Sequence, residues 1–144
     1  MSKLKVLIAG STGYIGIQLI TLLCKHKNVE IKYLCGNSSV GQNISYYSKK
    51  LKKKKLPKII KFKKELLYNV DLIFTALPNG EAQELSKYLL KKNVLIDLAA
   101  DFRLKEPKDY MKWYKQKHKA IKNIKRSIYL LPELNKEKLN NYQI

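Results

Sequence analysis

Three glycines at a fixed spacing near the start of the sequence are the residues best suited to binding a phosphate group. Gly10, Gly13 and Gly16 follow an apolar run over 6–9 and precede a segment whose apolar residues recur every three or four positions. The run is typical of a buried parallel strand, and the later spacing is typical of a helix. Three glycines also suit a plain tight turn, but a strand, a glycine turn and a helix start together expose backbone N–H groups to a pyrophosphate. The pattern therefore predicts a dinucleotide-binding loop.

The composition indicates one globular domain. The chain has 144 residues, of which 45% are hydrophobic, enough to bury a substantial core. No apolar run approaches the roughly 18 residues of a membrane span, and the N-terminus lacks the apolar segment of a signal peptide. We therefore expect a cytoplasmic protein with no membrane partner. Cys24, Cys35, His26 and His118 show no metal-ligand spacing, so we predict no metal site.

The net charge of +19 suggests a polyanionic partner, but the kind of basic residue argues against specific recognition. All but two of the 30 basic residues are lysines, which are less suited than arginine to bidentate contacts with phosphates and bases. The lysines also occur in nearly every segment, and the densest run, over 49–55, is typical of a solvated surface. We therefore predict no specific nucleic-acid partner, although the charge can help to attract small anions.

Strand-like and helix-like segments alternate along the chain. The predicted strands are 6–9, 29–35, 56–62, 70–77, 94–98 and 127–131, with another opening at 142–144, and the predicted helices are 15–23, 81–92, 107–118 and a turn over 135–139. This alternation is typical of an α/β fold with a doubly wound parallel sheet, the Rossmann-like arrangement. Ligands of such sheets bind at the carboxyl ends of the strands, where Gly10, Cys35, Leu77 and Ala99 fall.

The segment after the second predicted strand favours NADP over NAD. An acidic residue usually holds the ribose 2′-hydroxyl of NAD at this point. No Asp or Glu lies between Lys32 and Lys64, so a 2′-phosphate would meet no nearby carboxylate. Ser38 and Ser39, in the predicted turn over 36–39, are candidate contacts for this phosphate.

Five motifs in order resemble the N-acetyl-gamma-glutamyl-phosphate reductase family of arginine biosynthesis, and the resemblance covers essentially the whole chain. The motifs are Gly-Ser-Thr-Gly-Tyr-Ile-Gly at 10–16, Ala-Leu-Pro-Asn-Gly at 76–80, Leu-Ala-Ala-Asp-Phe-Arg-Leu at 98–104, the group Tyr110, Trp113, Tyr114 and His118, and Tyr-Leu-Leu-Pro-Glu-Leu-Asn at 129–135.

This resemblance implies a two-domain, homo-oligomeric, NADP-dependent enzyme related to aspartate-semialdehyde dehydrogenase. In such enzymes a cysteine thiolate attacks an acyl phosphate, here N-acetylglutamyl 5-phosphate, and phosphate leaves. NADPH then reduces the thioester to the aldehyde, N-acetylglutamate 5-semialdehyde. The covalent intermediate divides one difficult displacement into two easier steps, and the cofactor supplies the hydride.

The resemblance also assigns residues to sites. The pyrophosphate would bind at Gly10, Ser11, Thr12, Gly13, Tyr14, Ile15 and Gly16, and the ribose and nicotinamide at Ala76, Leu77 and Pro78. Arg103 is the candidate for an anionic group of the substrate, because a guanidinium matches phosphate or carboxylate geometry. A structural salt bridge from Arg103 to Asp101 or Glu106 is the alternative.

Other residues of the matching motifs have plainer interpretations. Glu133 either holds the loop before the nucleophile or starts a helix at Asn135. The aromatic residues Tyr110, Trp113 and Tyr114 are expected to pack in the core, and His118 is expected to be an ordinary surface histidine.

Two departures from the family pattern affect the expected function. Asn37 stands where the family commonly has an arginine after the second strand, and the family's Asn-Pro-Gly-Cys segment would lie beyond residue 144. We therefore expect a single NAD(P)-binding domain over 1–144, truncated before the catalytic cysteine, with the second catalytic and dimerisation domain absent from this chain. Cys24 and Cys35 do not suit the missing role. We predict no catalytic residue in this chain and no activity from it alone.

Two other functions remain open from the sequence. An extended short-chain dehydrogenase or epimerase also uses this glycine spacing and needs a Tyr-x-x-x-Lys pair, which occurs at Tyr46/Lys50 and Tyr88/Lys92. About two such pairs are expected by chance in a chain so rich in tyrosine and lysine. A binding-only protein, either a nucleotide sensor or a basic nucleic-acid-associated protein, is the other alternative.

Overall fold

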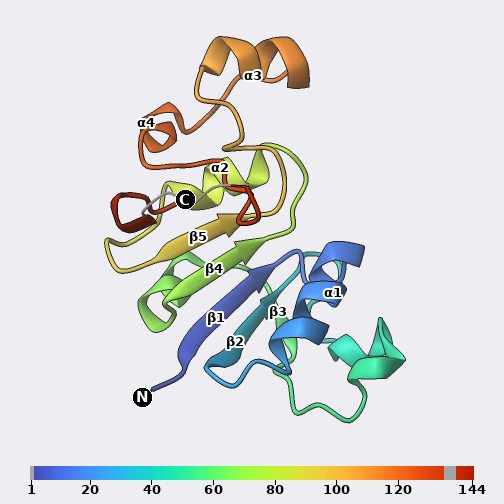
Figure 1. Ribbon diagram of the computed structural model, residues 1–144. Helices are drawn as coiled ribbons and strands as arrows, with labels where there is room; N and C mark the ends of the chain where they lie inside the picture. The colour runs from blue at the N-terminus through green and yellow to red at the C-terminus, as the bar shows by residue number, and fades with distance from the viewer. Residues whose placement is uncertain (1, 135–138) are drawn as a thin grey trace.

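The computed structural model describes residues 2–134 and 139–144, and its centre is one parallel sheet. Five strands lie in the order β3-β2-β1-β4-β5, and every neighbouring pair is parallel (Figure 1). The strands are β1 (Leu4–Ala9), β2 (Val29–Cys35), β3 (Ile59–Ile60), β4 (Leu72–Thr75) and β5 (Val94–Asp97). The predicted doubly wound α/β fold is confirmed.

Helices cover both faces of this sheet. They are α1 (Tyr14–Leu23), α2 (Glu81–Ser86), α3 (Pro107–Tyr114) and α4 (Ile121–Ile124), with the 3-10 segments η1 (Ile44–Tyr46), η2 (Lys49–Leu51), η3 (Lys64–Asn69) and η4 (Leu139–Asn141). Because side chains alternate along a strand, Val6 and Ile8 pack with Ile20 of α1, whereas Leu7 packs with Leu85 of α2. The two apolar layers hold β1 in the centre of the sheet.

Two predicted helices end earlier than expected. The helix predicted over 81–92 ends at Ser86, and the side chain of Asn93 accepts a hydrogen bond from the N–H of Leu90 at 2.9 Å. The helix predicted over 107–118 ends at Tyr114, because Lys115 has a positive φ of 57° and closes the helix with a bond to Met111. Asn135–Lys138 of the predicted helical turn lie outside the described residues.

The strands predicted over 127–131 and 142–144 are wrong. These segments make isolated hydrogen bonds instead of a ladder: Ile128 N–H donates to Ile144 O at 2.9 Å, and Leu95 N–H donates to Gln143 O at 2.8 Å. The end of the chain therefore lies against β5 without extending the sheet.

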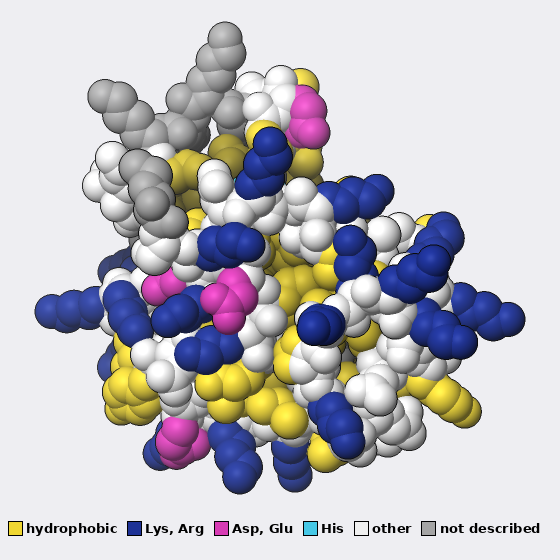
Figure 2. All heavy atoms as spheres, turned by 90° about the horizontal axis from the view of Figure 1, so that it is seen from below, with side chains coloured by type: hydrophobic (Ala, Val, Ile, Leu, Met, Phe, Trp, Pro, Cys, Tyr) yellow, Lys and Arg dark blue, Asp and Glu magenta, His cyan; other side chains and the backbone are white. Residues whose placement is uncertain are grey.

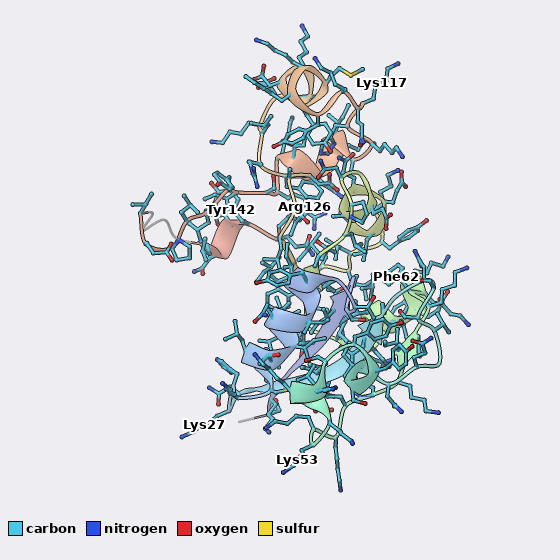
Figure 3. The ribbon with its side chains drawn as sticks, turned by 90° about the vertical axis from the view of Figure 1, so that its right-hand side faces the viewer. Lys27, Lys53, Phe62, Lys117, Arg126 and Tyr142 are labelled. Carbon is cyan, nitrogen blue, oxygen red and sulfur yellow. The ribbon has the colours of Figure 1, made fainter. Side chains whose placement is uncertain are left out.

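Basic side chains are spread over the surface. In Figure 2 the Lys and Arg side chains surround the visible face without gathering into one patch. Lys27, Lys53 and Lys117 point away from the body of the molecule in three directions (Figure 3). In the run over 49–55 only Leu51 is buried, which confirms the predicted solvated surface. Within the described residues, no helix is long and apolar enough to cross a membrane.

Candidate functional site

The glycine loop after β1 is fixed between the ends of two neighbouring strands. Gly10 has a φ of +83°, and a Cβ there would collide with the carbonyl oxygen of Ala76, just after β4. On the other side, the N–H groups of Gly10 and Ser11 both donate to the carbonyl of Cys35, the last residue of β2, at 3.1 Å. Only glycine satisfies both the backbone angle and the close approach.

Gly16 and Gly13 differ in what surrounds them. A Cβ on Gly16 would collide with the carbonyl oxygen of Gly10, so this glycine lets α1 pack directly on the loop. A Cβ on Gly13 would make only an ordinary contact, 3.6 Å from the same oxygen, and Gly13 is exposed. The sequence therefore leaves the outer side of the loop at Gly13 open to a ligand.

The start of α1 offers unused backbone donors beside this opening. The first helical hydrogen bond runs from Ile17 N–H to Gly13 O at 2.9 Å, and among the described residues the N–H groups of Tyr14, Ile15 and Gly16 have no backbone acceptor. These donors and the positive end of the helix dipole favour an anion. Tyr14 and Ile15 have exposed side chains, so their backbone groups are the part suited to bind a phosphate.

Ser11 and Thr12 serve the loop in different ways. The Ser11 side chain is fully buried, and its hydroxyl donates to Cys35 O at 3.0 Å. It anchors the loop to β2 and leaves the backbone to contact a ligand. Thr12 is half-buried.

Beyond β2, Ser39 carries a buried hydroxyl whose oxygen has no hydrogen-bond partner among the described residues. A Cβ on Gly36, the first residue after β2, would collide with this oxygen, so the glycine leaves space beside it. A buried polar atom without a partner is rare in proteins and suggests a missing ligand. Ser38 and Asn37 are exposed in the same turn. This donor set fits the additional phosphate of NADP.

The loop after β4 is joined to the glycine loop and to the loop after β5. Ala76 N–H donates to Ala9 O at 2.9 Å, and the Leu77 side chain lies beside Gly10. The N–H of Gly80, which has a φ of +95°, donates to Asp101 Oδ1 at 2.7 Å. The predicted contact residues of this loop, Ala76, Leu77 and Pro78, therefore lie at the same edge of the sheet as the glycine loop.

A buried carboxyl group that the sequence analysis did not identify as a site residue organises the loop after β5. Asp101 is fully buried and accepts hydrogen bonds from the N–H of Gly80, from the N–H and Nε2 of Gln83 at 3.2 and 3.0 Å, and from the hydroxyl of Tyr110 at 2.8 Å. It thereby caps the N-terminus of α2 from another part of the chain. Burial and the bond to Asp101 raise the pKa of Tyr110 above its usual range.

His118 belongs to this network, and the expectation of a surface histidine is wrong. Its ring is buried, Nε2 lies 2.8 Å from Asp101 O, and Nδ1 accepts a hydrogen bond from Ala120 N–H at 3.2 Å. Nε2 therefore carries the proton in the neutral ring. Desolvation lowers the pKa of His118.

The expectation for the neighbouring aromatic residues is confirmed only in part. Tyr110 is fully buried, and its ring lies 4.8 Å from that of the half-buried Tyr114. Trp113, in contrast, is 70% exposed. It lies on the exposed side of α3, where Lys112 Nζ is 5.7 Å from the centre of its ring.

Asp97, the last residue of β5, supports the start of the same loop. Its Oδ1 accepts hydrogen bonds from Thr75 Oγ1 at 2.8 Å and from Ala99 N–H at 3.2 Å, and its Oδ2 accepts one from Asp101 N–H at 3.1 Å. Burial raises the pKa of Asp97 despite these bonds. The carboxylate of Asp97 thus holds the backbone of the residues that follow β5 in a tight turn around it.

Arg103 lies exposed after this turn. Among the described residues it forms no ion pair with Asp101 or Glu106, so the salt-bridge alternative is wrong. Its Nη2 donates to Ala99 O at 3.3 Å, and the guanidinium carbon lies 5.5 Å from the ring centre of Tyr129. Glu133 is also exposed, and Asn135, the predicted helix start after it, lies outside the described residues.

Neither cysteine is suited to act as a nucleophile. Burial raises the pKa of Cys35 to about 12, and burial also raises the pKa of Cys24. Both side chains therefore remain thiols at neutral pH. In the part of the chain that the structure describes, no three His, Cys, Asp or Glu residues form a group that could hold a metal ion.

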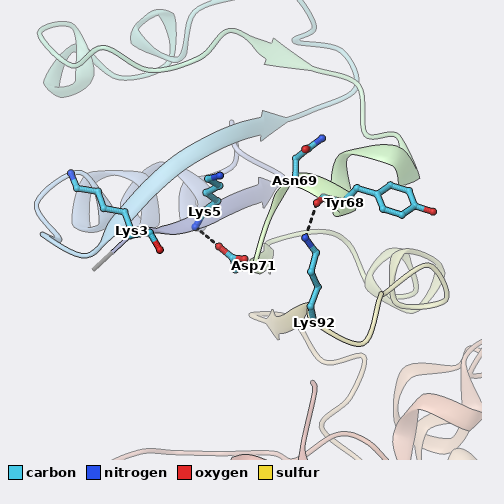
Figure 4. A pocket seen from close by; sticks show the side chains of 7 residues that line it. Lys3, Lys5, Tyr68, Asn69, Asp71 and Lys92 are labelled. Atoms are coloured by element: carbon cyan, nitrogen blue, oxygen red, sulfur yellow. Dashed lines mark hydrogen bonds between the residues drawn. The ribbon is translucent and has the colours of Figure 1, made fainter.

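The Tyr-x-x-x-Lys pairs of the dehydrogenase alternative lie away from the glycine loop. Lys92 lines a cavity of about 220 Å³ at the amino ends of the strands, where its Nζ donates to Tyr68 O at 2.7 Å (Figure 4). This is the edge of the sheet opposite the glycine loop. Tyr46 lies in η1 and packs edge-on against Tyr47. Neither pair has the placement that a catalytic tyrosine and lysine would need.

Comparison with known proteins agrees with this geometry. Curated N-acetyl-gamma-glutamyl-phosphate reductases of Brachyspira hyodysenteriae and Clostridium novyi are 38% and 44% identical to the chain, over 98% and 91% of its length. The chain covers 42% and 39% of these proteins, and so spans about two fifths of their length. A solved aspartate semialdehyde dehydrogenase with NADP, from Candida albicans, shares the fold with a TM-score of 0.59 and 24% identity, over 74% of this chain and 32% of that one.

The family model described as semialdehyde dehydrogenase, NAD binding domain, matches residues 5–142, from the second residue of β1 to the residue before Gln143. The match includes every loop of the candidate site. The chain therefore belongs to the semialdehyde dehydrogenase family of NAD-binding domains.

Proposed function

We propose that residues 1–144 are the cofactor-binding part of an N-acetyl-gamma-glutamyl-phosphate reductase, which reduces N-acetylglutamyl 5-phosphate with NADPH to the semialdehyde and releases phosphate. The observation that carries this proposal is the meeting of three motifs at one edge of the sheet. The segments 10–16, 76–80 and 98–104 are far apart in sequence, yet they follow the neighbouring strands β1, β4 and β5. In parallel sheets this edge is where ligands bind.

The residues present fit NADPH, which supplies a hydride when bound. The free N–H groups at the start of α1 would bind the pyrophosphate, with Gly13 giving the backbone access to it. The unpaired Ser39 hydroxyl and the exposed Ser38 would donate to the 2′-phosphate in place of the arginine that Asn37 replaces. Residues 76–78 would line the ribose and nicotinamide.

Arg103 would bind an anionic group of the substrate. Its guanidinium is exposed, and no carboxylate of the described residues pairs with it. The planar fork of N–H groups matches a phosphate or a carboxylate, both of which this acyl phosphate carries.

The remaining parts of the reaction would come from outside these residues. Because the half-buried thiol of Cys24 and the buried thiol of Cys35 do not suit attack on an acyl phosphate, we place the catalytic cysteine and the second domain in the part of the relatives that this chain does not span. We further propose that the complete enzyme is a cytoplasmic homo-oligomer.

A comparison of NADPH and NADH tests the cofactor proposal. We would titrate the 144-residue chain with each and follow the nicotinamide fluorescence, for the parent and for Ser39→Ala. Removing a hydrogen bond to a charged phosphate costs ~1.5–3 kcal/mol, so NADPH affinity should fall about tenfold or more while NADH binding stays unchanged. Since the Ser39 hydroxyl has no hydrogen-bond partner among the residues that the structure describes, the substitution should not destabilise the fold.

Ser45→Ala, in η1 and outside the proposed site, is the matched control and should bind both cofactors like the parent. Equal affinity of the parent for NADPH and NADH would contradict the preference for NADP. Reduction of the acyl phosphate by these 144 residues alone would contradict the proposal that the nucleophile lies elsewhere.

A further inference from the structure

The contact between Arg103 and Tyr129 brings together two segments that are distant in sequence. The guanidinium carbon lies 5.5 Å from the centre of the Tyr129 ring, within the range of a cation–π interaction. Both side chains are exposed, and Tyr129 is 51% accessible. The Tyr129 ring thus restricts the position of the exposed Arg103 side chain.

The arginine side of this pair stands on a rigid loop. The half-buried Asp97 holds the backbone of residues 99–101 by accepting hydrogen bonds from Ala99 N–H and Asp101 N–H. The buried carboxylate of Asp101 joins this loop to α2 and α3, and Arg103 N–H donates to Ala100 O at 3.3 Å. Nη2 of Arg103 donates to Ala99 O. One corner of the guanidinium is thus fixed to its own loop, and its other N–H groups make no hydrogen bond to the described residues.

The tyrosine side is anchored separately. Arg126 O accepts hydrogen bonds from the N–H groups of Gln143 and Ile144, and Ile128 N–H donates to Ile144 O. The backbone carbonyl of Gln143 in turn accepts a hydrogen bond from the N–H of Leu95 in β5. Tyr129 directly follows this segment, so hydrogen bonds to the end of the described chain, and through it to β5, hold the backbone that carries the ring.

We propose that Tyr129 is a positioning residue that holds the Arg103 guanidinium as a preformed receptor for an oxyanion. The ring fixes the plane of the guanidinium, the carbonyl of Ala99 occupies one of its donors, and the remaining N–H fork faces the ligand. That the oxyanion is the phosphate or carboxylate of an acyl phosphate rests on the proposed function; the receptor itself does not.

Preorganisation is the physical benefit of this arrangement. An arginine side chain that is free in solution must lose rotamer freedom when it binds an anion, and a side chain already held over a ring loses less. The aromatic face leaves the edge of the guanidinium, where its N–H groups lie, free for hydrogen bonding. Substitution of the ring should therefore weaken anion binding without removing the charge.

The experiment is a ¹⁵N NMR titration of the 144-residue chain that follows the arginine Nε–H signals. The sequence has two arginines, Arg103 and Arg126, so Arg126→Lys assigns both signals. The Arg103 signal should be displaced by the ring current of Tyr129, and should move when inorganic phosphate or N-acetylglutamate is added. Phosphate measures the interaction with a phosphate group, and N-acetylglutamate that with carboxylates.

In Tyr129→Leu the ring-current displacement should vanish, and the affinity of Arg103 for the anion should fall about two- to fivefold, the range expected for one exposed cation–π contact. Tyr129→Phe keeps the ring and should restore both. Tyr68→Leu, which removes an exposed tyrosine at the opposite edge of the sheet, is the matched control and should change neither.

An unchanged Arg103 signal and unchanged anion affinity in Tyr129→Leu would overturn the proposal. So would anion binding by Arg103 that Tyr129→Phe weakens as much as Tyr129→Leu. NADPH binding, measured on the same samples, separates this outcome from failure of the proposed function: a chain that binds NADPH but shows no effect of Tyr129 contradicts only the positioning role.

Discussion

Two loops lie at the carboxyl ends of the strands, and different kinds of interaction hold them in shape. The loop over 10–16 is shaped by backbone: three glycines, a pair of N–H groups on the carbonyl of Cys35, and the open start of α1. The loop over 97–103 is shaped by side chains: the half-buried Asp97 accepts N–H groups of the loop itself, and the buried Asp101 accepts those of Gly80 and Gln83. The first suits the pyrophosphate that dinucleotides share, whereas in our proposal the second presents Arg103 to the substrate.

This difference determines how each loop can fail. The glycine loop tolerates no added atom where backbone meets backbone, and the Ser11 hydroxyl is the one side-chain group that the structure shows anchoring it among the described residues. The second loop depends on one buried carboxyl group, because the carboxylate of Asp101 joins the loop after β4 to the helices α2 and α3. Four substitutions, two in each loop or its supporting network, test this difference.

Asp101→Ala should have the largest effect. It leaves the N–H groups of Gly80 and Gln83 and the hydroxyl of Tyr110 buried without an acceptor, and each such group costs ~1–3 kcal/mol. The free energy of unfolding, measured with urea, should fall by more than about 3 kcal/mol. Asp109→Ala, in the exposed first turn of α3, is the control and should cost less than about 1 kcal/mol. Similar losses in the two variants would show that the network does not hold the second loop.

Gly16→Ala and Gly13→Ala should separate folding from binding in the first loop. The added methyl of Gly16→Ala meets the Gly10 carbonyl, and such overpacking costs ~1–3 kcal/mol. The methyl of Gly13→Ala meets no close neighbour, so the loss should stay below about 1 kcal/mol, the cost of alanine at a helix N-cap. Thermal unfolding measures the difference, and NADPH titration should show weakened binding in both. A stable Gly13→Ala variant with parent affinity would contradict the proposed approach of the pyrophosphate.

A smaller effect is expected from His118 and only at mildly acidic pH. Desolvation lowers the pKa of His118, so the folded chain keeps the ring neutral while the unfolded chain binds a proton below about pH 6.5. Its contribution to stability is complete above that pH and is lost as the pH falls toward the lower folded-state pKa. Urea midpoints between pH 5 and 8 should therefore decrease toward acid in the parent and less steeply in His118→Gln. His26→Gln, which replaces an exposed histidine, should keep the parent slope.

The backbone-built part of the molecule was the more predictable from sequence. The apolar run before Gly10, the glycine spacing and the helical spacing after it are local patterns, and β1, α1 and β2 formed as predicted. The β-strand propensity of residues 127–131 is also a local pattern, but the strand that it predicts does not form. This segment pairs at single points with the end of the chain, and such tertiary contacts override propensity.

The side-chain network was not predictable from one sequence. Nothing in the spacing of Gln83, Asp101, Tyr110 and His118 indicates that they meet, because three separate segments must first fold onto one another. The burial of His118 and the exposure of Trp113 follow from that packing. The one available sign was the high density of motif residues between 98 and 118, which indicated importance without indicating structure.

The residues at the end of the described chain also affect whether the edge of the sheet can pair with a strand of another molecule. An edge strand with unpaired N–H and C=O groups is a template for aggregation through intermolecular β-pairing. Here the backbone carbonyl of Gln143 accepts a hydrogen bond from the outward-facing N–H of Leu95. The side-chain Nε2 of Gln143 donates to Leu90 O and Asn93 O. At the opposite edge, β3 is only two residues long. Both borders of the sheet are thus poor templates for another strand, which helps a protein with so many apolar strand residues to avoid aggregation through intermolecular β-pairing.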